Sequence, residues 1–295
     1  MLTADSPLSL RIAGYLGERF PPVVYTVLVV LFFGSAVLNA SALTAAPLSW
    51  RVLLGAPVVW LVFFHLRVFD EHKDFSLDVI AHPERLLSRG VVTLPLLARL
   101  AGAAILMEGL LSVLLGWPAL AAWAAALVFS VLMRLEFGVG EWLSSRILLY
   151  AVTHNPIVGL LALVGFFSIG AGFSPRFLWY VAAASLASLA FELGRKIRLP
   201  EEEIAGVDSY SSVHGRARAG LILSGVILGA AGLTGVAVWT VSPSVGQHAL
   251  SGVLVLLGAL VGIVEARPGR PAKKVELGSA LFLLIILLAM GIAAW

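Results

Sequence analysis

The chain contains no cysteine, so neither disulfide bonds nor thiolate ligands for a metal ion are available. Charge is also scarce: only 13% of the 295 residues are charged, whereas about 25% is usual in a soluble domain. Hydrophobic residues make up 60% of the chain, and the mean hydropathy is +0.98. A water-soluble fold of this composition would expose large apolar patches. The composition therefore favours a chain that lies in lipid.

Nine apolar stretches approach the length of about 20 residues that a membrane-spanning helix needs. They are 21–43, 51–69, 96–117, 118–136, 149–173, 177–194, 217–241, 248–266 and 275–295. Backbone groups cannot stay unpaired in hydrocarbon, so we expect helices. Apolar residues recur at helical spacing over 7–20, which predicts an interfacial helix before the first span. The sequence thus predicts an all-α, polytopic membrane protein with a single transmembrane domain over 1–295.

Lysine and arginine are distributed very unevenly along this predicted topology. If the N-terminus is cytoplasmic, only Arg51 and Arg176, of 20 basic residues, fall on the other side. This asymmetry obeys the positive-inside rule and supports both the number of spans and the direction. The longest polar connections, about 70–95 and 195–216, then both lie in the cytoplasm. We expect an integral protein of a bacterial or archaeal inner membrane.

Carboxylates cluster where the second span ends. Asp70, Asp74 and Asp78 are spaced four apart and Glu71 is three before Asp74, which places them on one face of a continuing helix. Like charges at this spacing repel, and anions at a helix C-terminus are disfavoured. A divalent cation removes both objections, and hard oxygen ligands suit Mg²⁺ or Ca²⁺. The alternative is a solvated acidic loop, but the regular phase at a membrane helix end favours a metal site.

This stretch resembles the aspartate-rich motif of the UbiA superfamily of intramembrane prenyltransferases. That motif, Asn-Asp-x-x-Asp-x-x-x-Asp, ends the second helix, and an Arg commonly stands three positions before its Asn. Here Arg67 precedes the motif, Asp70 takes the Asn position and Glu71 the first Asp position, while the later two acids match. The stretch 82–90 is similar to the family's Arg-Pro-Leu-x-x-Gly segment. The resemblance, which covers nearly the whole chain, implies a UbiA-like helix bundle.

The second half departs from the family pattern. The family carries a second motif, usually Asp-x-x-x-Asp, after the sixth helix, followed by glycines. Here the glycines Gly206 and Gly215 fit, but the paired Asp is absent, and Glu192 and the run Glu201–Glu203 are its candidate substitutes. The resemblance therefore implies a divergent subfamily and leaves a second metal ion open.

The resemblance implies Mg²⁺-dependent transfer of a prenyl group from an allylic (poly)prenyl diphosphate to a lipophilic acceptor, aromatic acceptors included, at the cytoplasmic side of the bilayer. Asp74 and Asp78 would be catalytic. The residues that would hold the metal are Asp70, Glu71, Asp74, Asp78 and Glu192. Those that would bind the substrate diphosphate are Arg67, Arg146, Arg195 and Lys196, with Arg146 the best positional match to the family's basic pair between spans four and five. Nucleic acid is not an expected partner.

Glu108 is an acid inside the third predicted span. Intramembrane acids are rare and often functional, so we expect Glu108 to orient an acceptor hydroxyl or to accept a proton. A protonated side chain hydrogen-bonded to a neighbouring helix is an equal alternative, because nothing nearby in the sequence identifies its partner.

Other functions remain open. A phosphoribosyl-type diphosphate donor would use the same acidic cluster, and a degenerate homologue would have lost activity. A transporter would suit Glu108, although transport sites usually lie near the midplane and this cluster lies at the rim. A CDP-alcohol phosphotransferase is disfavoured, because its string Asp-x-x-Asp-Gly-x-x-Ala-Arg does not occur.

Overall fold

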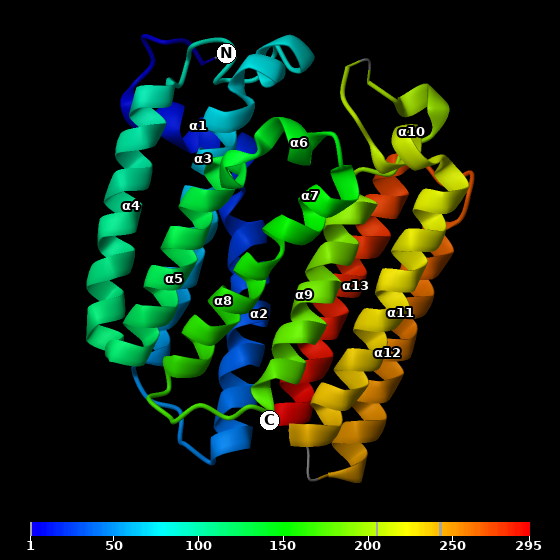
Figure 1. The fold of residues 1–295 in the computed structure, drawn as a ribbon. Coiled ribbons are helices and arrows are strands. Elements are labelled where there is room, and N and C mark those ends of the chain that lie inside the picture. Colours follow the sequence, from blue (N-terminus) through cyan, green and yellow to red (C-terminus); the bar gives the residue numbers. More distant parts are fainter. Residues whose placement is uncertain (1, 205, 242–243) are drawn as a thin grey trace.

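The computed structural model describes residues 2–204, 206–241 and 244–295, and all regular secondary structure in these ranges is helical (Figure 1). Within them, nine segments are long and apolar enough to cross a membrane. They are α2 (Pro22–Thr44), α3 (Val52–Ala81), α4 (Leu94–Leu115), α5 (Trp117–Arg134), α7 and α8 together (Ile147–Phe167), α9 (Phe177–Gly194), α11 (Arg216–Val241), α12 (Val245–Ala266) and α13 (Ala272–Ala294). The predicted all-helical architecture and the positions of its spans are confirmed.

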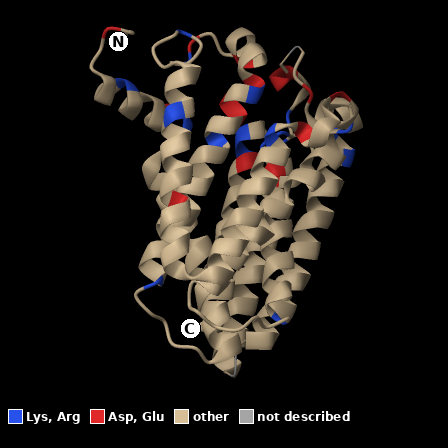
Figure 2. Ribbon diagram, turned by 60° about the vertical axis from the view of Figure 1, so that its left-hand side comes forward, with Lys and Arg blue, Asp and Glu red and all other residues tan. Residues whose placement is uncertain are grey.

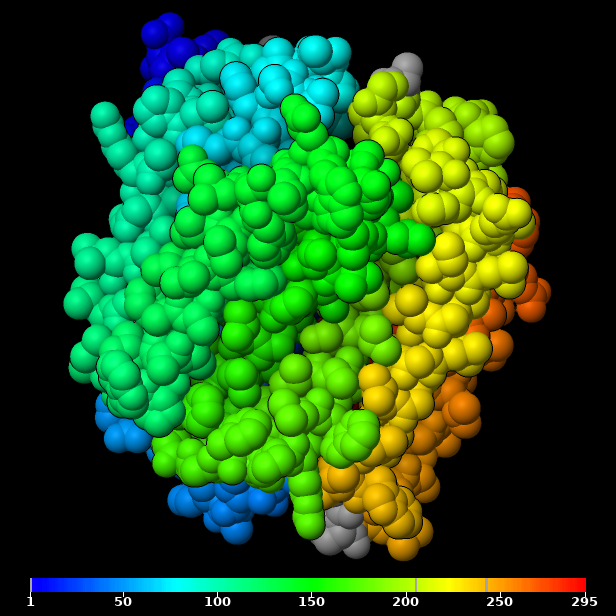
Figure 3. Space-filling model, in the orientation of Figure 1, coloured from blue at the N-terminus to red at the C-terminus, as the bar shows by residue number. Residues whose placement is uncertain are grey.

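The short elements gather at the end of the bundle where the chain begins, and the chain ends at the opposite end (Figure 1). They are α1 (Leu8–Arg19), the 3-10 turn η1 (Glu136–Gly138), α6 (Gly140–Ser144), the 3-10 turn η2 (Pro200–Glu202) and α10 (Tyr210–His214). The green residues of α6 and α7 cover the upper centre of the face shown in Figure 3. α1 is the helix predicted over 7–20, and its Tyr15 is buried beside α3 and α4.

Two helix boundaries follow directly from proline and glycine. The fifth span consists of α7 (Ile147–His154) and α8 (Pro156–Phe167), because Pro156 has no N–H to donate across the junction. Asn155 at this break donates instead to the Ser185 carbonyl at 2.9 Å. α4 and α5 meet at Gly116, whose φ of 102° is costly for other residues, and Trp117 and Pro118 form the first turn of α5.

α3 is longer than its predicted span. The prediction ended this span at 69 and assigned about 70–95 to a loop, but the helix continues to Ala81. Arg67 and Glu71 form an ion pair one turn apart, which supports this extension. The acidic residues therefore lie on a helix face, and the connection to α4 covers 82–93. Residue 205 of the predicted second loop lies outside the described residues.

Charged residues gather at one end of the bundle, as Figure 2 shows. At the opposite end lie Arg51, which precedes α3, and Arg176, which precedes α9. At the charged end, the last residue of α9, Gly194, packs closely on α13, where a Cβ would collide with the Ser279 side chain. Small residues let membrane helices approach in this way. The bundle thus holds the ends of α3 and α9 at the same charged end.

Candidate active site

The four carboxylates at the end of α3 have very different surroundings. Glu71 is 1% exposed, and its Oε1 accepts hydrogen bonds from Nε of Arg19 at 2.7 Å and from Nη2 of Arg67 at 2.7 Å. Asp78 is bound by Nη1 of Arg85 at 2.7 Å and by Nη2 of Arg19 at 3.4 Å. These two acids fasten α3 to α1 and to the connection that follows α3.

Asp70 and Asp74 are not held in this way. The Asp70 side chain is half exposed, and its nearest cation is Nζ of Lys73 at 3.7 Å. In the described part of the chain, Asp74 forms neither a hydrogen bond nor an ion pair, although it lies beside Lys73. Asp70 and Asp74 also repel each other at this spacing, and a bound cation would remove that repulsion. Asp70 and Asp74, four residues apart on one face, are therefore the acids available to a cation.

Glu192, near the end of α9, lies close enough to Asp70 for the two charges to interact. Its carboxylate binds Nε of Arg195 and, at 3.0 Å, Nζ of Lys196. Burial alone would lower the pKa of Arg195, but the carboxylates of Glu192 and Asp70 raise it above its usual value. Burial and the charge of Glu192 likewise raise the pKa of Tyr210. Arg195 therefore interacts with carboxylates from both α3 and α9. The candidate residues predicted at the end of the second span and at the end of the sixth span lie close together.

Two residues of this site were missed or undervalued by the sequence analysis. Neither Lys73 nor Tyr150 has a predicted role in the sequence analysis. Nζ of Lys73 donates to the Tyr150 hydroxyl at 2.6 Å, and this hydroxyl points to Oε1 of Glu136 at 3.4 Å. Tyr150 also stacks on His154, with ring centroids 4.0 Å apart. The spacing of Tyr150 and His154, four apart at the start of a span, was the available signal.

The predicted diphosphate-binding cations divide into two groups. Arg195 and Lys196 lie at Glu192, as just described. Arg67 donates both Nε and Nη2 to Glu71 and so holds α3. Arg146 is exposed, stacks on Trp142 at 4.4 Å and donates to the Trp142 carbonyl at 2.7 Å. The structure thus gives Arg67 and Arg146 local partners, and Lys73 takes the position beside the free carboxylates.

Two of the acids proposed as substitutes for the second motif have structural partners instead. Oε2 of Glu202 accepts the backbone N–H groups of Leu199 and Ala272, both at 2.9 Å, and these bonds lower the pKa of Glu202. Oε1 of Glu203 accepts the hydroxyls of Ser209 at 2.7 Å and Ser211 at 2.8 Å. Among the candidate substitutes, Glu192 is therefore the one that meets the end of α3.

Glu108 has no accessible surface, and both its oxygens are hydrogen-bonded. Oε1 lies 2.8 Å from Nδ1 of His65, and Nε1 of Trp123 donates to Oε2 at 2.9 Å. This geometry leaves no open side for an acceptor molecule. The catalytic role expected for Glu108 is therefore replaced by the alternative, a buried acid bonded to neighbouring helices.

The donor set fits a magnesium ion that is shared with a phosphate. No three His, Asp or Glu side chains in the described ranges converge into a complete metal cage. Mg²⁺ usually takes only one or two carboxylates and completes its shell with water and substrate phosphate. Asp70 and Asp74 supply such a pair, whereas the predicted ligands Glu71, Asp78 and Glu192 are bound by basic side chains. We therefore retain Asp70 and Asp74 as metal candidates.

No protein-family profile and no curated protein matches the chain. Solved structures do match. A digeranylgeranylglyceryl phosphate synthase aligns with a TM-score of 0.65 at 15% identity, over 96% of this chain and 98% of the other. A UbiA homologue from Aeropyrum pernix K1 aligns with a TM-score of 0.66 at 18% identity, over 90% and 96%. A UbiA homologue from Archaeoglobus fulgidus, bound to DMAPP and Mg²⁺, aligns with a TM-score of 0.65 at 13% identity, over 94% and 98%. The chain thus has the fold of the UbiA homologues over nearly its whole length, as its acidic motif predicted.

Proposed function

We propose that the protein is a Mg²⁺-dependent prenyltransferase, which moves a prenyl group from an allylic (poly)prenyl diphosphate to a lipophilic acceptor. The observation that carries this proposal is the pair Asp70 and Asp74, which lack strong donors and lie near Arg195, Lys196 and Glu192 at one end of a UbiA-like bundle. The homologue from Archaeoglobus fulgidus is bound to DMAPP and Mg²⁺, which supports the same ligands here.

The charged side chains have distinct tasks in this reaction. Asp70 and Asp74 would hold Mg²⁺, which would neutralise the charge that grows on the diphosphate as the carbon–oxygen bond breaks. Glu192 would hold Arg195 and Lys196 in place. Lys73, Arg195 and Lys196 would add fixed positive charge beside the leaving group. Lys73 is held by Tyr150 at 2.6 Å, so its ammonium group is already oriented.

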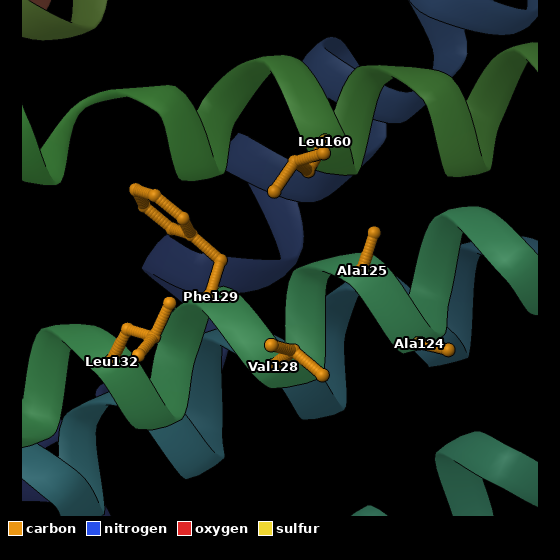
Figure 4. Close-up of a pocket in the computed structure, with 6 residues that line it drawn as sticks. All are labelled: Ala124, Ala125, Val128, Phe129, Leu132 and Leu160. Carbon is orange, nitrogen blue, oxygen red and sulfur yellow. The ribbon is translucent and has the colours of Figure 1, made fainter.

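An apolar groove offers a place for the isoprenoid tail. This open groove of about 460 Å³ lies between α5 and α8 and is lined by Ala124, Ala125, Val128, Phe129, Leu132 and Leu160. Figure 4 shows Phe129 and Leu160, from the two facing helices, pointing into it. Ring contacts lead from Phe129 to Phe137 at 5.6 Å and on to His154 at 5.4 Å, which stacks on Tyr150. A tail in this groove would therefore continue from a headgroup at Lys73, in surroundings that keep water from the allylic cation.

The charged end of the bundle is proposed to face the cytoplasm of a bacterial or archaeal cell. Arg51 and Arg176 alone, of 20 basic residues, lie toward the other end in the topology, which matches the positive-inside rule. The site would then receive a water-soluble diphosphate from the cytoplasm, or a membrane-bound one from the cytoplasmic leaflet.

A transporter is less well supported. Its strongest argument was an acid in mid-membrane, but Glu108 is enclosed and hydrogen-bonded on both oxygens. A phosphoribosyl donor has no apolar tail to occupy the groove between α5 and α8, so a prenyl donor fits better.

A donor screen tests the proposal. Membranes containing the protein are incubated with allylic diphosphates of several chain lengths and with lipid extracts, and products are identified by mass spectrometry. New prenylated lipids should form only when Mg²⁺ is present. If no allylic donor is consumed with any extract, while phosphoribosyl diphosphate is, the proposed donor is wrong.

A further inference from the structure

A polar network buried between α3, α4 and α5 takes no part in the proposed reaction. His65, Glu108 and Ser130 have no accessible surface. Nδ1 of His65 lies 2.8 Å from Oε1 of Glu108, and Nε2 lies 3.1 Å from Oγ of Ser130. Trp123 completes the network by donating to Oε2 of Glu108. Each of the three helices thus contributes a side chain to one connected set of hydrogen bonds.

The hydrogen bonds fix how many protons the His65–Glu108 pair holds. Ser130 has one hydroxyl proton and donates it to the Leu127 carbonyl at 2.7 Å, so its Oγ accepts from His65 and Nε2 carries a proton. The contact between Nδ1 and Glu108 needs a second proton, because a bare imidazole nitrogen and a carboxylate are both acceptors. Wherever this proton sits, the pair has no net charge. A net-neutral pair is the form that an apolar interior tolerates best.

The network fixes one face of α3, and the ion pair of Glu71 with α1 fixes a second face. Glu71 binds Arg19 of α1 at 2.7 Å. His65 and Glu71 lie about 120° apart around the axis of α3, at 3.6 residues per turn. α3 is therefore fixed in rotation by α4 and α5 on one side and by α1 on the other. Asp70 and Asp74 follow His65 within the next turns of the same unbroken helix.

We propose that His65 and Glu108 are positioning residues, whose shared proton fixes the rotation of α3 and thereby sets the direction of Asp70 and Asp74. This role rests on the proposed function, since those two acids matter only if they hold a metal and a diphosphate. The net neutrality of the His65–Glu108 pair and its hydrogen bonds to α4 and α5 do not depend on the proposed function.

The variant Glu108→Gln is the matched control. Its amide has the same shape, its N–H donates to Nδ1 of His65, its oxygen accepts from Trp123, and the pair stays neutral. Glu108→Leu removes both bonds. The distance between spin labels on α3 and α4 reports the position of α3. Because the chain has no cysteine, labels attach only at the introduced Ile80→Cys and Leu106→Cys, whose native side chains are 81% and 65% exposed. Calorimetric titration with Mg²⁺ and inorganic pyrophosphate measures the affinity of the candidate active site.

We expect Glu108→Gln to keep the wild-type label distance, affinity and transfer rate. Glu108→Leu should broaden the distance distribution and lower the affinity by about tenfold or more, the usual effect of losing a residue that orients a metal ligand. Unchanged distance and affinity in Glu108→Leu would overturn the proposal. So would loss of transfer in Glu108→Gln at unchanged distance, because Glu108 would then exchange its proton during the reaction.

Trp123→Phe covers the case in which Glu108→Leu fails to fold. It removes the hydrogen bond to Glu108 together with part of the indole that packs at Gly109, and it leaves the His65–Glu108 contact in place. A smaller broadening of the same distance is expected, and a wild-type distribution together with wild-type affinity would overturn the proposal. If the wild-type protein binds no Mg²⁺ with pyrophosphate, the proposed function is contradicted. The label distances would still test whether His65 and Glu108 fix the position of α3.

Discussion

The ends of α3 and of α9 are both acidic, yet their acids are used differently. In the segment after α9, Glu202 and Glu203 accept backbone N–H groups and serine hydroxyls, so the acids build the loop. At the end of α3, Glu71 and Asp78 are bound by arginines, but Asp74 has no hydrogen bond or ion pair in the described part of the chain. The donors around an acid, rather than its spacing, decide whether it supports the fold or serves a ligand.

Asp74→Asn should produce the largest effect on activity and almost none on folding. Asp74 has no donor to lose, and the substitution removes repulsion from Asp70 and Asp78. We expect Mg²⁺-dependent prenyl transfer to fall about 100-fold or more, since even residues that only orient ligands change activity by about 10–100-fold. Steady-state transfer and thermal unfolding in detergent measure the two effects. A destabilised Asp74→Asn protein would contradict the contrast between the two kinds of acid.

Glu71→Gln should lower stability much more than it lowers metal binding. It leaves the charges of Arg19 and Arg67 without their shared carboxylate, and we expect a loss of about 3 kcal/mol in the free energy of unfolding. This is the lower end of the cost of breaking a buried ion pair, because both arginines keep some exposure. Equilibrium unfolding in mixed micelles measures it. Full stability together with lost metal binding would show that Glu71 is a metal ligand after all.

Lys73→Met should weaken binding of the diphosphate by about tenfold, the value of one charge-assisted hydrogen bond of about 1.5 kcal/mol. Arg146→Ala is the matched control, because Arg146 stacks on Trp142 and should be replaceable without loss of affinity. Titration of both variants with Mg²⁺ and pyrophosphate compares them. If Arg146→Ala weakens binding more than Lys73→Met does, the family-based assignment of Arg146 is correct.

Glu202→Gln should have the smallest effect, visible mainly as a change in pH dependence. Because two backbone N–H groups lower the pKa of Glu202 in the folded protein, its contribution to stability is present above the unfolded pKa, near 4.5, and disappears as the pH falls through the lower folded value. The thermal midpoint of the wild type should therefore fall more steeply than that of Glu202→Gln below about pH 4.5. Parallel pH profiles would show that Glu202 does not hold the loop.

The sequence predicts the spans and the acidic face of α3 because both depend on local information. Length and hydropathy define a spanning helix, and spacings of three and four place Asp70 and Asp74 together. It could not predict which acids remain free, because their donors come from far along the chain. Arg19 reaches Glu71 across 52 positions, and Ala272 reaches Glu202 across 70. The contact between Lys73 and Tyr150, 77 positions apart, was hidden for the same reason.

The central claim is that Asp70 and Asp74 bind a diphosphate through a divalent cation. Calorimetric titration of the purified wild-type protein with a non-reactive thiolo analogue of an allylic diphosphate, with and without Mg²⁺, tests it most directly. We predict binding only when Mg²⁺ is present, and its loss in Asp74→Asn. Equal affinity with and without Mg²⁺, or wild-type affinity in Asp74→Asn, would contradict the account.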